Sequence, residues 1–409
     1  MKKIFSLVCL LAGFFTSSLS AQMVEEPPYR RSSICSFLIN HDDQPFAKEI
    51  RQAFCNIPVS DKFNDHELSV KVLTLSKKLK GAGSSKENEE ISSFLDKNLV
   101  ASRLVGKWFE RSNETGVCHM NLIQERGLYD ATEYTRVLAS KSTRSQALLA
   151  DAGEELIGKT FVLVNDIRYV DKAKAGEILG MGLRILGALA GAATGNSNYN
   201  NLGNDVGSLA ETLKGFKVKI NTFLYKLEWN DEIAATFYKE LYTSQPDEAK
   251  RQAFEKARSN FKLTYVGKVE SSGSTTSFMG IKLDEPVQMV RKACQRAIDE
   301  NIAALQSDFE EFRTKTPLVS ASPIRAFIGM KEGVKKDSRF EVLETVVTED
   351  GKRIYKRVGV ITPMPDYIWD NRYMAEEEGT PAAALGFTTF KKISGNDFAP
   401  GMLIREIKK

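Results

Sequence analysis

The chain has 409 residues, of which 42% are apolar, as in an ordinary globular protein long enough for two domains. It carries 57 basic and 53 acidic residues; without the two lysines of the first 21 residues, 55 basic residues remain and the net charge is +2. Such a small excess of positive charge gives no reason to expect nucleic acid as a partner.

Residues 1–21 have the pattern of a secretory signal peptide. Lys2 and Lys3 precede an apolar run over 4–15, and small residues follow over 16–21. The apolar run is too short to span a bilayer, and a buried N-terminal helix is the alternative interpretation. Cys9 lacks the preceding pattern of a lipoprotein signal. We therefore expect an exported protein of the periplasm or outer membrane, without a lipid anchor.

Four cysteines remain after the signal peptide. An exported compartment permits disulfides, and four cysteines allow three pairings. Cys35 and Cys55 form the easiest pair to envisage, because both lie in the N-terminal region. Cys118 and Cys294 lie on apolar faces and are expected to be core thiols.

Strands and helices alternate from residue 44 to residue 315, after a segment over 22–43 that looks irregular. The alternation predicts a layered α/β domain, and the long apolar run over 160–170 predicts a strand in the interior of a sheet. Expected strands cover 66–75, 116–122, 160–170, 216–229 and 261–269; expected helices cover 45–55, 84–109, 131–152, 233–242, 247–258 and 284–312.

A glycine-rich insertion over 173–215 interrupts this domain. Gly187, Gly191 and Gly195 are four residues apart, so on a helix they share a face that another backbone can approach closely. Three interpretations stay open: a helical hairpin docked on the sheet, a contact between subunits, and a contact with a membrane. A full span is disfavoured, because Arg184 would lie near the bilayer centre at a cost of about 3 kcal/mol.

From residue 316 to residue 409 the pattern changes to short strands without helices. This predicts a small β-barrel or sandwich, interrupted by a long loop over 363–386. The overall fold class is therefore α+β or α/β, with the β domain at the C-terminal end. Expected strands cover 325–329, 338–347, 353–362, 387–393 and 402–407.

The sequence contains no recognisable catalytic or metal-binding motif. The three histidines are far apart, and none has a metal-ligand spacing. Cys118 and His119 are adjacent, but neighbours in a strand point to opposite faces and cannot form a nucleophile–base pair. We predict no catalytic residue, cofactor or metal.

Two polar clusters beside a tryptophan are the best candidates for a ligand surface. An indole ring next to amide, carboxylate and guanidinium groups suits contact with a glycan or a peptide. A turn or a helix cap is the alternative interpretation for each cluster, with Asp231 placed to cap the helix that follows. The candidate residues are Trp229, Asp231, Trp369, Asp370, Asn371 and Arg372.

Several segments resemble known envelope proteins. Residues 124–127 and 147–166 are similar to the curli-secretion-channel lipoprotein family, in which a helix ending in an acidic-apolar run leads into a strand. Residues 328–344 and 356–361 resemble the β-domain of flagellar assembly protein T. The whole chain is also similar to uncharacterised secreted proteins of Bacteroidetes. It departs from the channel family by lacking a lipobox cysteine and amphipathic barrel hairpins.

These observations favour a non-catalytic exported envelope protein that assembles with other envelope proteins or with itself. The insertion over 173–215 would make the contact, to protein or to membrane. A glycan- or peptide-binding module is the second hypothesis. A hydrolase with an unrecognised site is the third.

Overall fold

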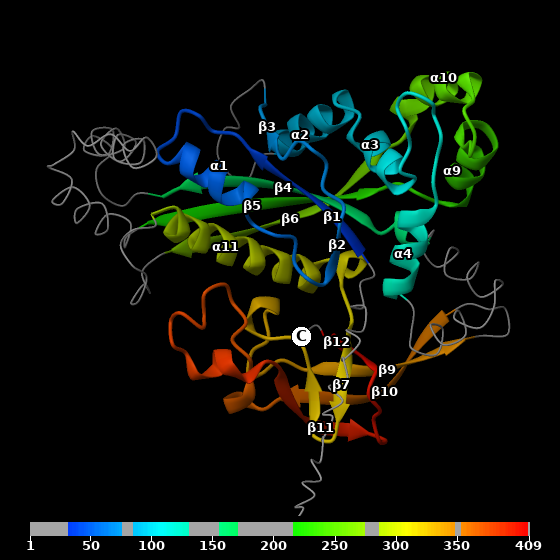
Figure 1. Cartoon of the computed structure of the whole chain (residues 1–409). Coiled ribbons are helices and arrows are strands. Elements are labelled where there is room, and N and C mark those ends of the chain that lie inside the picture. The colour runs from blue at the N-terminus through cyan, green and yellow to red at the C-terminus, as the bar shows by residue number, and fades with distance from the viewer. Residues whose placement is uncertain are drawn as a thin grey trace, which may run out of the picture.

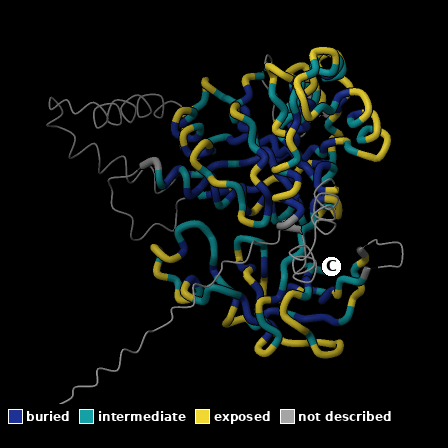
Figure 2. Tube along the Cα trace, turned by 45° about the vertical axis from the view of Figure 1, so that its right-hand side comes forward, coloured by how far each residue is buried: buried dark blue, intermediate teal, exposed yellow. Residues whose placement is uncertain are grey.

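A computed structural model describes residues 32–75, 85–130, 155–170, 216–274, 286–347 and 353–407. The chain forms an α/β domain and, below it in Figure 1, a closed β-barrel. Buried residues gather in each of these parts (Figure 2). The predicted fold class, with a barrel at the C-terminal end, is confirmed.

The α/β domain is built on one mixed sheet. Its strand order is β2-β1-β4-β5-β6, and β3 also pairs with β1. β1 runs parallel to β2, β3 and β4, whereas β5 and β6 continue the sheet in antiparallel register. The strands are β1 (Ser32–Ile39), β2 (Phe63–Asp65), β3 (Val72–Leu73), β4 (Thr160–Tyr169), β5 (Lys217–Leu227) and β6 (Leu263–Ser274).

Strand β1 lies inside the sheet, so the expectation of an irregular segment over 22–43 is wrong for Ser32–Ile39. Three serines interrupt the apolar pattern that normally marks a buried strand. Their polarity is tolerated because neighbours supply hydrogen bonds. The Ser33 amide donates to the Lys159 carbonyl (3.0 Å), and the Ser33 hydroxyl accepts from Arg126 (3.0 Å).

Helices cover both faces of the sheet. α1 and α11 pack on one face, and α2, α3 and α10 contribute to the apolar core on the other. The predicted helix over 84–109 is two helices, because Leu99 between them has a positive φ of 52°. The helices are α1 (Ala47–Cys55), α2 (Ser85–Lys97), α3 (Val100–Trp108), α4 (Asn121–Asp130), α9 (Asp231–Thr236), α10 (Glu248–Ala257) and α11 (Pro286–Asp308).

Strand β4 shows why the run over 160–170 is apolar on both sides. Phe161 and Leu163 face the core under α11, while Val162 and Val164 face the core under α2 and α3. A strand buried on both faces has no polar side to alternate with. The predicted interior strand is confirmed.

Helix α11 begins at Pro286, as expected for proline in a first turn, and lies along the sheet above the barrel (Figure 1). Its predicted apolar stripe, which includes Val290, Cys294 and Leu305, is buried against the sheet. β6 approaches this helix so closely that a Cβ at Gly273 would overlap the Ala293 carbonyl oxygen. One face of α11 is thus fixed, and the other faces the barrel.

Two predicted strands differ from the structure. Residues 116–122 form no strand. The amides of Cys118 and His119 donate to the carbonyls of Thr243 and Phe109 (2.8 and 2.7 Å), and neither of these carbonyls belongs to a strand. Helix α4 starts where that strand was expected to end. Within 66–75, only Val72–Leu73 pairs with the sheet.

The barrel closes in the order β10-β11-β8-β7-β12-β9. It has one strand more than the five expected, because Thr316–Ala321 pairs with both β8 and β12. Its interior holds apolar side chains such as Leu318, Val342, Ile361 and Phe390. The strands are β7 (Thr316–Ala321), β8 (Ile324–Ala326), β9 (Phe340–Val347), β10 (Arg353–Pro363), β11 (Thr388–Gly395) and β12 (Leu403–Glu406).

The cysteines of the described chain are free, so the expected pair of Cys35 and Cys55 does not form. Cys35 is buried in the central strand β1, whereas Cys55 is exposed at the end of α1. Cys118 and Cys294 are buried, as predicted for core thiols. Burial raises the pKa of Cys35 and of Cys294 to about 12, which keeps both thiols protonated.

The glycine-rich insertion, with Gly187, Gly191 and Gly195, lies outside the described residues. Within the described ranges, none of the helices combines the length and apolar character that crossing a bilayer requires.

Candidate functional site

In the predicted cluster around Trp229, the half-buried tryptophan packs against the core of the α/β domain, whereas Asp231 is exposed. The Trp229 ring packs 6.0 Å from the Phe109 ring and 5.6 Å from the Phe237 ring. Asn230, not Asp231, caps helix α9, because its side-chain oxygen accepts from the Ile233 amide at 2.9 Å. The expected cap at Asp231 is therefore wrong by one residue.

The predicted cluster at 369–372 lies in the long loop between β10 and β11. The Trp369 indole N–H donates to the Ala383 carbonyl (3.0 Å), and Asp370 accepts two bonds from Arg372 (2.8 and 2.6 Å). These contacts are internal to the loop, which gives it a fixed shape. Within this cluster, Arg372 alone lines the cavity described below.

Asn371 connects the loop to the turn that carries Lys331. Its side-chain oxygen accepts from the Lys331 amide (2.9 Å), and its amide nitrogen donates to a Glu332 carboxylate oxygen (2.8 Å). That carboxylate oxygen also accepts from the Gly329 amide (2.7 Å). Asn371 is thus a positioning residue for the 3-10 turn Met330–Glu332, which faces α11.

Charged side chains fasten the same loop to α11. Lys292 is 1% exposed and forms an ion pair with Glu378. Arg296 bonds to the other Glu378 oxygen (2.9 Å) and to the Tyr373 carbonyl (3.0 Å). The cations hold the pKa of Glu378 below its usual value against the opposing effect of desolvation. The barrel domain is therefore docked on α11 by a specific, partly buried network.

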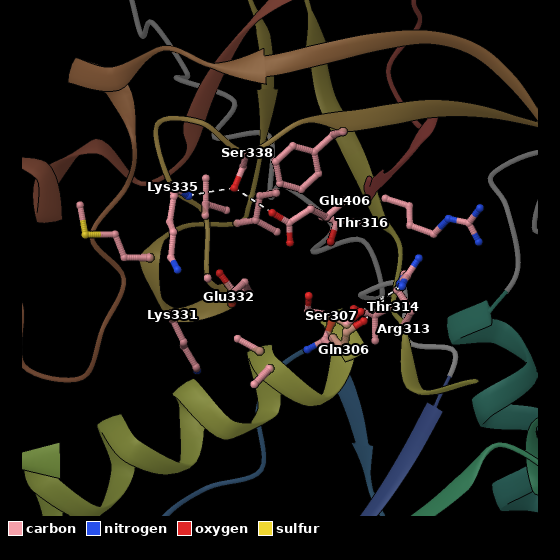
Figure 3. Close-up of a pocket in the computed structure, with 18 of the residues that line it drawn as sticks. Gln306, Ser307, Arg313, Thr314, Thr316, Lys331, Glu332, Lys335, Ser338 and Glu406 are labelled. Carbon is pink, nitrogen blue, oxygen red and sulfur yellow. Dashed lines mark hydrogen bonds between the residues drawn. The ribbon is translucent and has the colours of Figure 1, made fainter. Parts of the chain in front are cut away.

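A cavity of about 1070 Å³ lies beside this network, between the second half of α11 and the barrel (Figure 3). Lys331 and Lys335 stand on one side of it, and Arg313 and Thr314 stand on the other. Of the 28 described residues that line it, eight are basic and six are acidic. Because both signs of charge occur, the cavity suits a polar ligand and not an apolar one.

Asp299 of α11 lines the cavity with an unsatisfied carboxylate. The residue is 8% exposed, and its Oδ2 atom has no hydrogen-bond partner among the described residues. Desolvation raises the pKa of Asp299 to about 7. A buried acceptor without a partner costs stability, so its retention calls for an explanation.

Other charges in the cavity are also incompletely paired. Lys62 lies 4.0 Å from the free Glu332 oxygen, and burial lowers the pKa of the lysine. Glu406 accepts from the Ser338 hydroxyl (2.7 Å), and burial raises the pKa of that carboxyl. In the part of the chain that the structure describes, the ammonium groups of Lys331 and Lys335 form neither a hydrogen bond nor an ion pair.

The polar cluster around Asp166 is, by contrast, saturated. Its carboxylate bonds to His41 Nε2 (2.5 Å) and to the guanidinium of Arg168 (2.9 to 3.1 Å). The side chain of Asp166 is 1% exposed. A paired carboxylate of this kind needs no ligand to complete it.

Arg126, within the segment that resembles the channel family, closes a second saturated cluster. Its guanidinium lies over the Trp108 ring and donates to His66 Nδ1 (2.6 Å) and to the Asp65 carbonyl (2.7 Å). Burial and Arg126 hold the pKa of His66 well below its usual value. The neutral ring donates through Nε2 to the Leu104 carbonyl (2.9 Å), so the cluster ties α4 to the sheet.

The described residues contain no group of three or more side chains placed to hold a metal ion. Cys118, for which the sequence disfavours a role as a nucleophile, is buried, and desolvation raises the pKa of its thiol. It is therefore not activated, because reactive thiols have lowered pKa values.

Comparison with known proteins adds no relative. A scan against protein-family models gives no match, and a search of curated proteins finds none. The resemblances to the channel and flagellar families stay predictions.

Sequence reasoning missed Asp299, Lys331 and Lys335. Asp299 follows Gln295 by four residues, so the two form a polar line beside the apolar stripe of α11. On an isolated helix, side chains in such a line face water. The barrel docked on α11 buries the side chains of Gln295 and Asp299.

Proposed function

We propose that this is an exported, non-catalytic cell-envelope protein that acts by binding, with the cavity between α11 and the barrel as its binding site. The observation that carries the proposal is the carboxylate of Asp299, which lines a cavity large enough for a ligand and has no hydrogen-bond partner among the described residues. Ligand sites of about 300–1,000 Å³ with a few convergent polar groups are typical of proteins.

A ligand screen with a blocked cavity tests this proposal. Ser307 is exposed and points into the cavity from α11 (Figure 3). Ser307→Trp would fill the space, whereas Ser93→Trp places the same ring on an exposed position of α2, away from the cavity. Small peptides, cell-wall fragments, sugars and nucleotides are screened by thermal shift. Binding stabilises the folded state, so Tm should rise for the wild type and Ser93→Trp but not for Ser307→Trp.

Export and envelope location rest on the pattern of residues 1–21. Fractionation of native cells, followed by high-salt and carbonate washes of the membranes, tests them. Recovery in the periplasm or with the outer membrane is expected. Recovery in the cytoplasm with residues 1–21 still attached would contradict export.

The assembly hypothesis depends on the insertion over 173–215. Deleting these residues should leave a folded protein that has lost its association with the envelope or with itself. Unchanged association would remove the role given to the insertion and leave the cavity as the binding element.

The raised pKa of Asp299 is the observation that favours the hydrolase alternative, because general acids in clefts show such values. A hydrolase requires turnover that is lost in Asp299→Asn. A broad substrate screen with no turnover by the wild type would leave binding as the function.

A further inference from the structure

The side chains of the cavity define what its ligand must carry. Asp299 lines the cavity, and its carboxylate has no hydrogen-bond partner among the described residues, so a donor on a ligand can pair with it. Glu332 has one oxygen occupied by Gly329 and Asn371, and its other oxygen lies 4.0 Å from the Lys62 ammonium group. A cationic or donor-rich ligand group fits beside these two carboxylates.

Two lysines of the cavity favour a negatively charged group on the ligand. Lys331 is half-buried, Lys335 is exposed, and both side chains line the cavity on the same side (Figure 3). Neither ammonium group is within ion-pair distance of a carboxylate in the described residues, whereas Arg405 and Arg296 are paired with Glu341 and Glu378. The lysines are therefore available for an anionic ligand group.

The mixture of charges disfavours a ligand of one sign. A polyanion would meet the carboxylates of Asp299, Glu332 and Glu406, and a polycation would meet Lys331 and Lys335. Like charges brought together without compensation cost binding free energy. The ligand that fits carries both signs.

The residues that line the cavity also favour a peptide over a sugar as the ligand. Phe340 is the one aromatic residue among the described residues of the lining, and neither Trp229 nor Trp369 belongs to it. A ligand that binds by packing flat faces on aromatic rings would find little surface here. A ligand that binds through charged ends and hydrogen bonds would find many partners.

We propose that the cavity binds a short zwitterionic peptide, with its ammonium group at Asp299 and Glu332 and its carboxylate at Lys331 and Lys335. This inference rests on the proposed function, because it names the ligand class of the same cavity. The volume of about 1070 Å³ exceeds that of most drug-sized sites, so several residues of peptide have room.

Calorimetry with the purified protein at low salt tests the ligand class. The probes are tetra-alanine with free ends, the same peptide acetylated at its N-terminus, the same peptide amidated at its C-terminus, and chitotetraose. The free peptide should bind, each blocked end should raise Kd about tenfold, and the sugar should not bind. Added salt should weaken binding, because the contacts are charged.

Adjacent lysines provide a matched pair of variants. Lys335 lines the cavity, whereas Lys336 is equally exposed but does not. Lys335→Gln should raise Kd for the free peptide about tenfold, and Lys336→Gln should leave it unchanged. Asp299→Asn should weaken the free peptide more than the acetylated peptide, because acetylation already removes the ammonium group.

The outcomes separate the ligand class from the site. Equal binding of free and blocked peptides would overturn recognition of the charged ends. Binding of chitotetraose alone, abolished by Ser307→Trp, would overturn the peptide class and leave the cavity as the binding site. Absence of binding by every probe and by the wider screen would overturn both proposals.

Discussion

Asp299→Asn should make the protein more stable at pH 8, although it removes a buried charged group. The Asp299 carboxyl has a pKa of about 7 in the folded state, against 3.8 when unperturbed. A shift of one pKa unit between the unfolded and the folded state corresponds to about 1.4 kcal/mol. Ionisation of Asp299 therefore costs the folded state about 4 kcal/mol. A neutral amide avoids this cost. A buried amide without hydrogen-bond partners, however, itself costs the folded state about 2 kcal/mol. We expect a net gain of about 2 kcal/mol.

The stability gain of Asp299→Asn should become smaller as the pH falls. Because the folded pKa is the higher one, the folded state of the wild type binds an extra proton between about pH 4 and pH 7. The contribution of this group to stability therefore rises as pH falls through that window. Arg296 and Lys331 oppose the raised pKa, whereas Asp61 and Glu332 support it. Near pH 5 the advantage of the asparagine variant should shrink to about zero.

Urea unfolding followed by circular dichroism at pH 5 and pH 8 measures the effect. Asp166→Asn is the control, because that carboxylate is also buried but is bonded to His41 and Arg168. The control should lose about 3 kcal/mol at both pH values. If Asp299→Asn loses as much as the control at pH 8, the Asp299 carboxylate is satisfied and the reasoning behind the binding site is wrong.

Three further predictions concern packing and chemistry elsewhere. Gly273→Ala should cost about 2 kcal/mol in urea unfolding, because the new Cβ overlaps a backbone carbonyl of α11, whereas Gly106→Ala, inside helix α3 with open space around it, should gain up to about 1 kcal/mol. Glu378→Gln should cost about 3 kcal/mol and loosen the loop in hydrogen exchange, because it removes the carboxylate that pairs with the buried Lys292; an unchanged exchange pattern would contradict the docking role. Iodoacetamide should modify Cys55 and spare the other described cysteines, which are buried, as peptide mass mapping would show.

Apolar patterns were the reliable part of the sequence. The run over 160–170 predicted an interior strand, and the stripe from Val290 to Leu305 predicted the buried face of α11. Both succeed because burial on a regular element imposes a repeat that side chains display directly. Strand β7 was missed because Thr316–Ala321 is short and contains Pro317, and it is placed only by closure of the barrel.

Polar residues were predicted less well because their role depends on distant partners. Trp369 and Asn371 suggested a ligand surface, yet their hydrogen bonds shape a loop and hold Lys331 in place. Strand β1 is rich in serine and becomes a central strand because Lys159 and Arg126 satisfy Ser33.

The sequence by itself determined that an α/β part is followed by a β-barrel, because local patterns of apolar residues encode both. The tertiary structure alone decided the candidate site. Asp299 lies on the polar side of α11, where an isolated helix would expose it to water. The barrel, docked through Glu378 on Lys292 and Arg296, buries that carboxylate beside a cavity, where no described residue forms a hydrogen bond with it.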